Sequence, residues 1–210
     1  MNEEVNRRLG GLQSANCVLC SFNYAVIHKL NESYDAEGQG ALMVDAARKL
    51  IGIGAEGIML CADTLHQFAD RVEKEISVPL IHIATVTAKE IKKQNILTVG
   101  LLGTKYTMEM DFYRNRLNRE DIEVLIPNAD ERKYIHSKEV NEFLKGVFTD
   151  ESRTGFLKII NRLHSEGAEG IILGCTEFPL LIRSQDTTLS SEVFIAAPGQ
   201  SIFPNGHKAV

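Results

Sequence analysis

The sequence is short of several features that would place a protein in a specialised class. No apolar run approaches the roughly 20 residues that a membrane-spanning helix needs, and the first residues, MNEEVNRRLGG, have no apolar core of a secretion signal. The formal net charge of -5 gives no electrostatic basis for binding nucleic acid or an anionic membrane. Four cysteines in 210 residues are too few for a disulfide scaffold. We therefore expect a globular protein of the reducing cytoplasm, without nucleic-acid or membrane partners.

Motifs for metals and nucleotides are also missing. The six histidines show no ligand spacing, and no HExxH occurs. Cys17 and Cys20 form a CxxC, but residues 16–22 have the pattern of a strand, on which residues three apart point to opposite faces. No second cysteine or histidine pair completes a zinc site, and the glycine turn after Val99 lacks the P-loop pattern. We expect no metal, and a structural role for these two cysteines.

What the chain does contain is an internal repeat. Residues 54–60 (GAEGIML) recur as residues 167–173 (GAEGIIL), with a difference only where Met59 is replaced by Ile172. A match this close predicts two structurally equivalent halves. The same register aligns Ala62 with Cys175, so that only the second half has a cysteine at this position.

Short apolar runs alternate with stretches of helical periodicity, which indicates an α/β fold with parallel sheets. We expect residues 1–90 to form the first domain, joined by residues 195–210, and residues 91–194 to form the second. The expected helices are residues 2–9, 36–51, 65–76, 86–93, 107–117, 139–148 and 152–165. The expected strands are residues 16–22, 57–60, 79–83, 96–102, 123–126, 170–173 and 193–196, and the last should run back toward the first half.

Polar residues follow three of these strands, at the edge where open α/β sheets bind ligands. These turns contain Ala62, Asp63, Thr64 and His66 after the first strand, Thr104 and Thr107 after the second, and Cys175, Thr176 and Glu177 after the third. Two of these turns belong to the repeat, so we expect them to face each other across a cleft between the domains.

Cys175 is the strongest candidate for chemistry. It precedes a helix that Pro179 helps to start, and a thiol at a helix N-terminus has its thiolate favoured by the dipole. Thr176 can bind substrate or cap that helix. The alternative is a small buried residue before a helix. Asp63 similarly suits an N-cap, and His66 is either a packing residue or a base.

Three stretches resemble the aspartate/glutamate racemase superfamily: residues 167–182 (GAEGIILGCTEFPLLI), its C-terminal signature; residues 61–66 (CADTLH), its first-domain motif; and residues 100–108 (GLLGTKYTM). The resemblance covers residues 2 to 194. It implies two pseudo-symmetric parallel-sheet α/β domains with the active site in the interdomain cleft, a homodimer, and no cofactor.

In this family one cysteine from each domain flanks the α-carbon of the substrate, and the two exchange its proton by acid/base chemistry. By motif match Cys175 is the second-domain acid/base. The residues that would bind the substrate, a small amino acid or dicarboxylate, are Asp63, Thr64, Thr104, Thr107, Thr176 and Glu177.

The chain departs from the family pattern at several points. The first cysteine aligns with Ala62, and Cys61 lies one position early, where a strand end would point it to the other face. Asp63 replaces the family asparagine and would repel an acidic substrate unless it is protonated or paired. The usual first strand is missing and the C-terminal tail is atypical, with Asp-Thr-Thr at residues 186–188.

Three hypotheses follow from these residues. The first is a cofactor-independent racemase of aspartate, glutamate or a related amino acid. The second is a one-cysteine decarboxylase or isomerase of a small dicarboxylate, which protonates one face only. The third is a catalytically inactive carboxylate-binding relative. Ala62 and Asp63 favour the last two, whereas the intact Cys175-Thr176-Glu177 favours chemistry.

Overall fold

The computed structural model describes residues 2–183, 186 and 193–195, and the chain divides into two compact units. Residues 1–60 and 68–81 belong to the first unit, and residues 61–67 and 82–210 belong to the second. Every strand pair is parallel, which confirms the α/β prediction. The division into domains of residues 1–90 and 91–194 stays a prediction; by contacts, residues 61–67 and 82–90 belong with the second unit.

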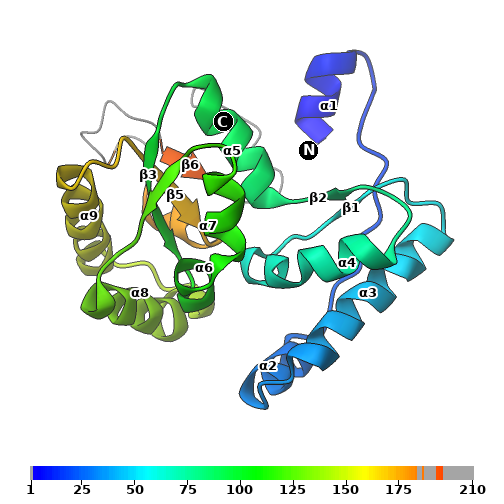
Figure 1. The fold of residues 1–210 in the computed structure, drawn as a ribbon, viewed down its shortest axis with the longest axis horizontal. Helices are drawn as coiled ribbons and strands as arrows, with labels where there is room; N and C mark the ends of the chain where they lie inside the picture. Colours follow the sequence, from blue (N-terminus) through cyan, green and yellow to red (C-terminus); the bar gives the residue numbers. More distant parts are fainter. Residues whose placement is uncertain (1, 184–185, 187–192, 196–210) are drawn as a thin grey trace. The chain divides into compact units, whose positions relative to one another are not determined.

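The first unit pairs two short strands beside its helices (Figure 1). Its elements are α1 (Asn2–Leu9), α2 (Tyr24–Glu32), α3 (Ala36–Gly52), β1 (Ile58–Met59), α4 (Ala69–Glu75) and β2 (Leu80–Ile81). Asp35 caps α3 by accepting a hydrogen bond from the Gly38 amide at 2.7 Å. Ion pairs Arg71–Glu37 and Arg48–Glu75 join α3 to α4.

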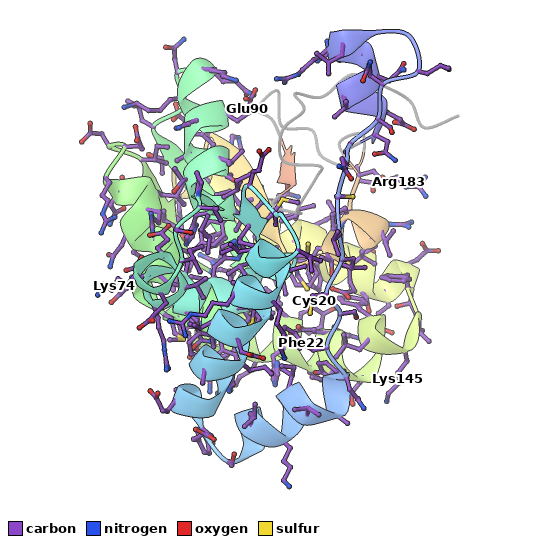
Figure 2. The ribbon with its side chains drawn as sticks, turned by 90° about the vertical axis from the view of Figure 1, so that its right-hand side faces the viewer. Cys20, Phe22, Lys74, Glu90, Lys145 and Arg183 are labelled. Carbon is purple, nitrogen blue, oxygen red and sulfur yellow. The ribbon has the colours of Figure 1, made fainter. Side chains whose placement is uncertain are left out.

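The predicted strand at residues 16–22 is wrong. This stretch has neither helix nor strand, and Figure 2 shows Cys20 and Phe22 on it. Val18, Leu19 and both cysteines are exposed, so the cysteines do not have the buried role expected of them. An apolar run forms a strand only where another strand satisfies its backbone, and no strand of the described residues pairs with this one.

The second unit contains a four-stranded parallel sheet in the order β4-β3-β5-β6. Its strands are β3 (Thr98–Gly103), β4 (Glu123–Leu125), β5 (Gly170–Gly174) and β6 (Val193–Ile195). Every residue of β5 is buried, as its continuous apolar sequence predicts for a strand with both faces covered. The expectation that the last strand runs back toward the first half is wrong, because β6 pairs with β5.

Helices cover both faces of this sheet, with α8 and α9 on one side and α5 and α7 on the other (Figure 1). The helical elements are η1 (Asp63–Phe68, whose last residue belongs to the first unit), α5 (Ile83–Lys93), α6 (Lys105–Glu109), α7 (Asp111–Asn118), α8 (Ala129–Asn141), η2 (Phe143–Lys145), α9 (Asp150–Ser165) and α10 (Phe178–Leu181). Each face of the sheet therefore has its own core. In the described residues, no helix is long and apolar enough to cross a membrane.

Several predicted helices differ from the structure in their bounds, and for two of them the difference has a local cause. Helix α8 begins ten residues before the predicted 139, because Asn128 and Glu131 form a capping box. The predicted helix at residues 107–117 is two helices, α6 and α7, separated by Met110 in an extended conformation. The capping box is visible in the sequence as N-x-x-E, and hydrophobic periodicity alone missed it.

Candidate active site

The register of β3 and β5 brings two of the predicted polar turns together. Gly103 pairs with Gly174, so Thr104 and Cys175 both leave the sheet at its carboxyl edge on neighbouring strands. A side chain at either glycine would crowd its neighbours. A Cβ on Gly103 would lie 2.8 Å from the Thr107 side chain, and one on Gly174 would lie 3.1 Å from the Leu102 carbonyl oxygen. The absence of side chains lets Thr107 pack directly on the strand ends.

Three threonine hydroxyls gather at this edge. Thr104 caps α6 by accepting a hydrogen bond from the Thr107 amide at 3.2 Å. Its Oγ1 lies 3.1 Å from Thr107 Oγ1 and 3.0 Å from Thr64 Oγ1. The structure thus brings together three of the residues predicted to bind substrate, from segments 40 residues apart. Hydroxyls of this kind can each donate a hydrogen bond to a carboxylate.

Cys175 lies buried at the end of β5, with 6% of its surface exposed. Its Sγ donates to Glu177 Oε2 at 2.9 Å, and Thr176 Oγ1 donates to the same oxygen at 2.8 Å. Glu139 Oε1 from α8 lies 4.0 Å from the Sγ. Burial, together with the charges of Glu139 and Glu177, raises the pKa of the Cys175 thiol well above its usual range.

The expectation that a helix N-terminus favours the Cys175 thiolate is therefore wrong. Helix α10 has only four residues, so its dipole is small. The carboxyl groups of Glu139 and Glu177 oppose a negative charge on sulfur, and burial removes the water that would solvate it. Both effects favour the protonated thiol over the thiolate.

Asp63 is also buried, with 4% of its surface exposed. Among the described residues its Oδ1 has no hydrogen-bond partner. Burial raises the pKa of Asp63 to about 7, and the charge of Glu177 adds to the shift. A carboxyl group with this pKa is partly protonated near neutral pH. That weakens the repulsion of an acidic substrate expected from the sequence.

His66 is held by the backbone through both ring nitrogens. The Ile83 amide donates to Nε2 at 3.1 Å, which leaves the proton on Nδ1, where it donates to the Ala62 carbonyl at 3.0 Å. Burial lowers the pKa of His66 to about 4. The ring packs against His82, with centroids 4.6 Å apart, and burial likewise lowers the pKa of His82 to about 3. The geometry favours the packing alternative for His66, fixing the turn that carries Ala62 and Asp63.

These two histidines should make the protein sensitive to mild acid. Unfolded histidines take up protons near pH 6.5, whereas folded His66 and His82 stay neutral to about pH 4 and 3. The unfolded state then binds more protons, so stability falls as pH drops through this window by about 1.4 kcal/mol per pH unit for each histidine. Asp63 acts oppositely: its raised pKa costs stability as pH rises from about 4 to 7. Among these three groups the two histidines outweigh the aspartate, so we expect their combined contribution to the free energy of unfolding to fall toward acid.

Urea unfolding between pH 4.5 and 7.5 checks this expectation. His82→Asn keeps an acceptor for the Ala84 amide, which His82 caps, but removes one titrating group. Its free energy of unfolding should vary less with pH than that of the wild type by about 1 kcal/mol per unit. His164→Asn, at an exposed position, is the control for the replacement of a histidine by asparagine. Parallel curves for His82→Asn and wild type would contradict the neutral, buried histidine pair.

Sequence reasoning missed one member of the site, Glu139. It lies on α8, 36 residues before Cys175 in the sequence, and no motif links the two. Cys61, by contrast, is exposed. Among the described residues, no group of three or more histidine, cysteine or acidic side chains is arranged to hold a metal ion.

The fold and the site define a parallel α/β protein with a buried thiol and a cluster of hydroxyls at the carboxyl edge of its sheet. The Asp/Glu/hydantoin racemase family model matches residues 1–197. The chain belongs to this family, as the resemblance in its motifs predicts.

Solved structures agree in fold over most of the chain. A Yersinia pestis protein assigned as an Asp/Glu racemase is 40% identical to this chain. Its structure superposes with a TM-score of 0.86, covering 93% of this chain and 84% of that one. An aspartate racemase homologue from Pyrococcus horikoshii OT3 is 34% identical, with a TM-score of 0.78 and the same coverage. Glutamate racemase from Francisella tularensis, 19% identical with a TM-score of 0.58 over 79% of this chain and 60% of that one, shares the fold.

A curated relative matches a shorter stretch. Glutamate racemase of Carnobacterium sp. (strain St2) is 24% identical over 129 residues, which are 61% of this chain and 47% of the relative. The match therefore spans about half the length of that enzyme.

Proposed function

We propose that the protein is a cofactor-independent amino-acid racemase that transfers the α-proton of a small acidic amino acid through Cys175. The observation that carries this proposal is the buried Cys175 thiol at the end of β5, beside the threonine hydroxyls at the end of β3. An α-proton is acidic enough to move only when the substrate carboxylate is held and the proton-transfer group is poised next to the carbon.

Each predicted residue has a role that its contacts support. Thr64, Thr104 and Thr107 would hold a substrate carboxylate, and Thr176 would add a fourth hydroxyl. Asp63, when protonated, would donate a hydrogen bond to an acidic substrate. Glu177 holds the thiol in place. We propose aspartate or glutamate as the substrate, by analogy with relatives named glutamate racemase and aspartate racemase homologue, and a cytoplasmic homodimer as the working form.

Ala62 favours a second candidate, in which one thiol protonates one face of a carbanion. In a two-cysteine enzyme a second thiol at this position would exchange a proton with the opposite face of the α-carbon. Here the residue is alanine, whose methyl side chain cannot do so. A protonated Cys175 also suits proton donation, as after decarboxylation of a small dicarboxylate or during its isomerisation. The third hypothesis, a carboxylate-binding protein without activity, requires only the hydroxyl cluster.

Proton NMR in D₂O separates the three candidates. The measurement follows loss of the α-hydrogen from L- and D-aspartate and from L- and D-glutamate. Exchange of both enantiomers, with each converted to the other, supports the racemase. Exchange or deuteron delivery on one face only, with these substrates or with small dicarboxylates, supports the one-cysteine reaction. If these compounds stabilise the protein against heat but none exchanges its α-hydrogen, the result supports the third hypothesis, a carboxylate-binding protein without activity.

Restoring a cysteine at position 62 should raise racemase activity. Ala62→Cys supplies a thiol opposite Cys175, and a positioned general acid or base contributes about 10²- to 10⁴-fold in rate. We expect at least a tenfold rise in interconversion of the enantiomers, measured by circular dichroism of the amino acid. Ala62→Ser, which is similar in size but lacks a thiol, is the control and should give no comparable rise. An unchanged rate in a folded Ala62→Cys variant would argue against the two-base geometry.

A further inference from the structure

Two successive contacts connect an exposed side chain, through a buried one, to the Cys175 thiol. His136 on α8 has 52% of its side chain exposed, and its Nδ1 lies 3.6 Å from Glu139 Oε2. Glu139, one helical turn later and 8% exposed, places its other oxygen, Oε1, 4.0 Å from Cys175 Sγ. One residue is open to solvent, the next is buried, and the last is the proposed proton-transfer group.

The neighbours of Glu139 explain its burial only in part: His136 Nδ1 lies 3.6 Å from one oxygen, and Cys175 Sγ lies 4.0 Å from the other. Among the described residues its Oε2 has no hydrogen bond, and an unpaired carboxyl oxygen in the interior is costly. The neighbouring cations of α8 are engaged elsewhere, since Arg132 pairs with Glu109 of α6 and Lys138 pairs with Glu142. Burial raises the pKa of Glu139, so its carboxyl group holds a proton more readily than an exposed glutamate does.

We propose that His136, Glu139 and Cys175 form a proton relay that reloads the buried thiol from solvent. This inference rests on the function proposed for Cys175. When the thiol has given its proton to the α-carbon, the thiolate takes a proton from the Glu139 carboxyl group. The Glu139 carboxylate then takes one from the His136 imidazolium, which regains a proton from water or buffer. When Cys175 removes a proton, the steps run in reverse, and no other reactant is consumed.

Glu177 is the alternative group that could exchange a proton with Cys175, because it lies closer to the thiol than Glu139 does. Its Oε2, however, already accepts hydrogen bonds from both Cys175 Sγ and Thr176 Oγ1. Of the two carboxylates that face the sulfur, only Glu139 has an imidazole neighbour in the described part of the chain. Glu139 and His136 would not touch the substrate. They would act only through Cys175, by keeping its thiol in the protonation state that the reaction needs.

Chemical rescue distinguishes a relay from a structural role. His136→Ala should lower α-hydrogen exchange about tenfold in dilute buffer, and added imidazole should restore most of the rate by supplying the missing proton donor. Glu139→Gln should be slowed at least as much, and imidazole should not restore it, because the link next to sulfur is lost. Lys133 is exposed one turn earlier on α8, and Lys133→Ala is the control. This variant should exchange the α-hydrogen at the wild-type rate, with or without imidazole. Wild-type rates in both relay variants, or a slow His136→Ala variant that imidazole does not rescue, would overturn the relay.

A second readout needs no turnover. Serine at positions 17, 20 and 61 leaves Cys175 as the sole thiol of the four cysteines. In that background Glu139→Gln removes a carboxylate charge beside the sulfur, so alkylation of Cys175 by iodoacetamide at pH 8 should be at least about tenfold faster. If the wild type exchanges no α-hydrogen, this faster alkylation still supports the coupling of Glu139 to the thiol while the proposed function fails. An unchanged alkylation rate would overturn the coupling.

Discussion

Cys175→Ala is expected to lower α-hydrogen exchange about a thousandfold or more, to a level indistinguishable from the uncatalysed reaction. The thiol is the proposed acid/base at the strand end, and removing a general acid/base usually costs about 10²- to 10⁴-fold. No second cysteine stands in for it, because position 62 is alanine and Cys61 is exposed. The measurement is proton NMR in D₂O with whichever substrate the wild type exchanges.

Two further variants make this result specific to the thiol. Cys175→Ser keeps a hydroxyl of similar size that is a much weaker acid, and it should be almost as impaired as the alanine variant. Cys61→Ala should exchange at the wild-type rate. If Cys175→Ala retains most of the exchange while Cys61→Ala loses it, the site has been assigned to the wrong cysteine.

Phe156→Ala should produce the largest loss of stability, about 3–5 kcal/mol in the free energy of unfolding. The ring is fully buried and packs edge-to-face against Phe143 and Phe178, with centroids 5.5 and 5.1 Å apart. Truncation removes its buried apolar area and leaves a cavity that the neighbouring helices fill only in part. Urea unfolding followed by circular dichroism gives the free energy.

The same substitution should impair the site, because Phe178 begins the helix that follows the Cys175 turn. Leu180→Ala, on the exposed side of that helix, is the matched control and should cost less than about 1 kcal/mol. A loss below about 1.5 kcal/mol for Phe156→Ala would mean that the aromatic cluster is not the packing centre beneath the site.

The two copies of the repeat form the same local structure but have different side chains at the equivalent positions Ala62 and Cys175. The repeated residues supply β1 in one unit and β5 in the other, and a polar turn follows each strand. In the second half the turn holds a thiol and a glutamate, whereas in the first it holds a methyl group and a buried aspartate. Whether the protein racemises or protonates one face depends on this difference, which the Ala62→Cys experiment addresses.

Elements with strong periodicity could be predicted from the sequence. Helix α1 has the predicted bounds, α3 extends one residue beyond them, and α9 begins two residues earlier than predicted. The strands β3 and β5 were predicted from continuous apolar runs, which suit a sheet covered on both faces. Helix α2 was missed, and residues 16–22 were predicted as a strand that does not form. Local pattern does not reveal whether a partner strand is present, and pairing decides that outcome.

The sequence by itself determined the family, the α/β class, and the place of Cys175 and Thr104 at strand ends, because each depends on residues close together in the chain. Only the tertiary structure decided the ionisation of the site. Burial, together with the charges of Glu177 and of Glu139, 36 residues away, raises the pKa of the Cys175 thiol, and the pKa of Asp63 rises to about 7 because the fold removes water from it. Desolvation and the charges of distant neighbours depend on packing in three dimensions, and no local motif records them.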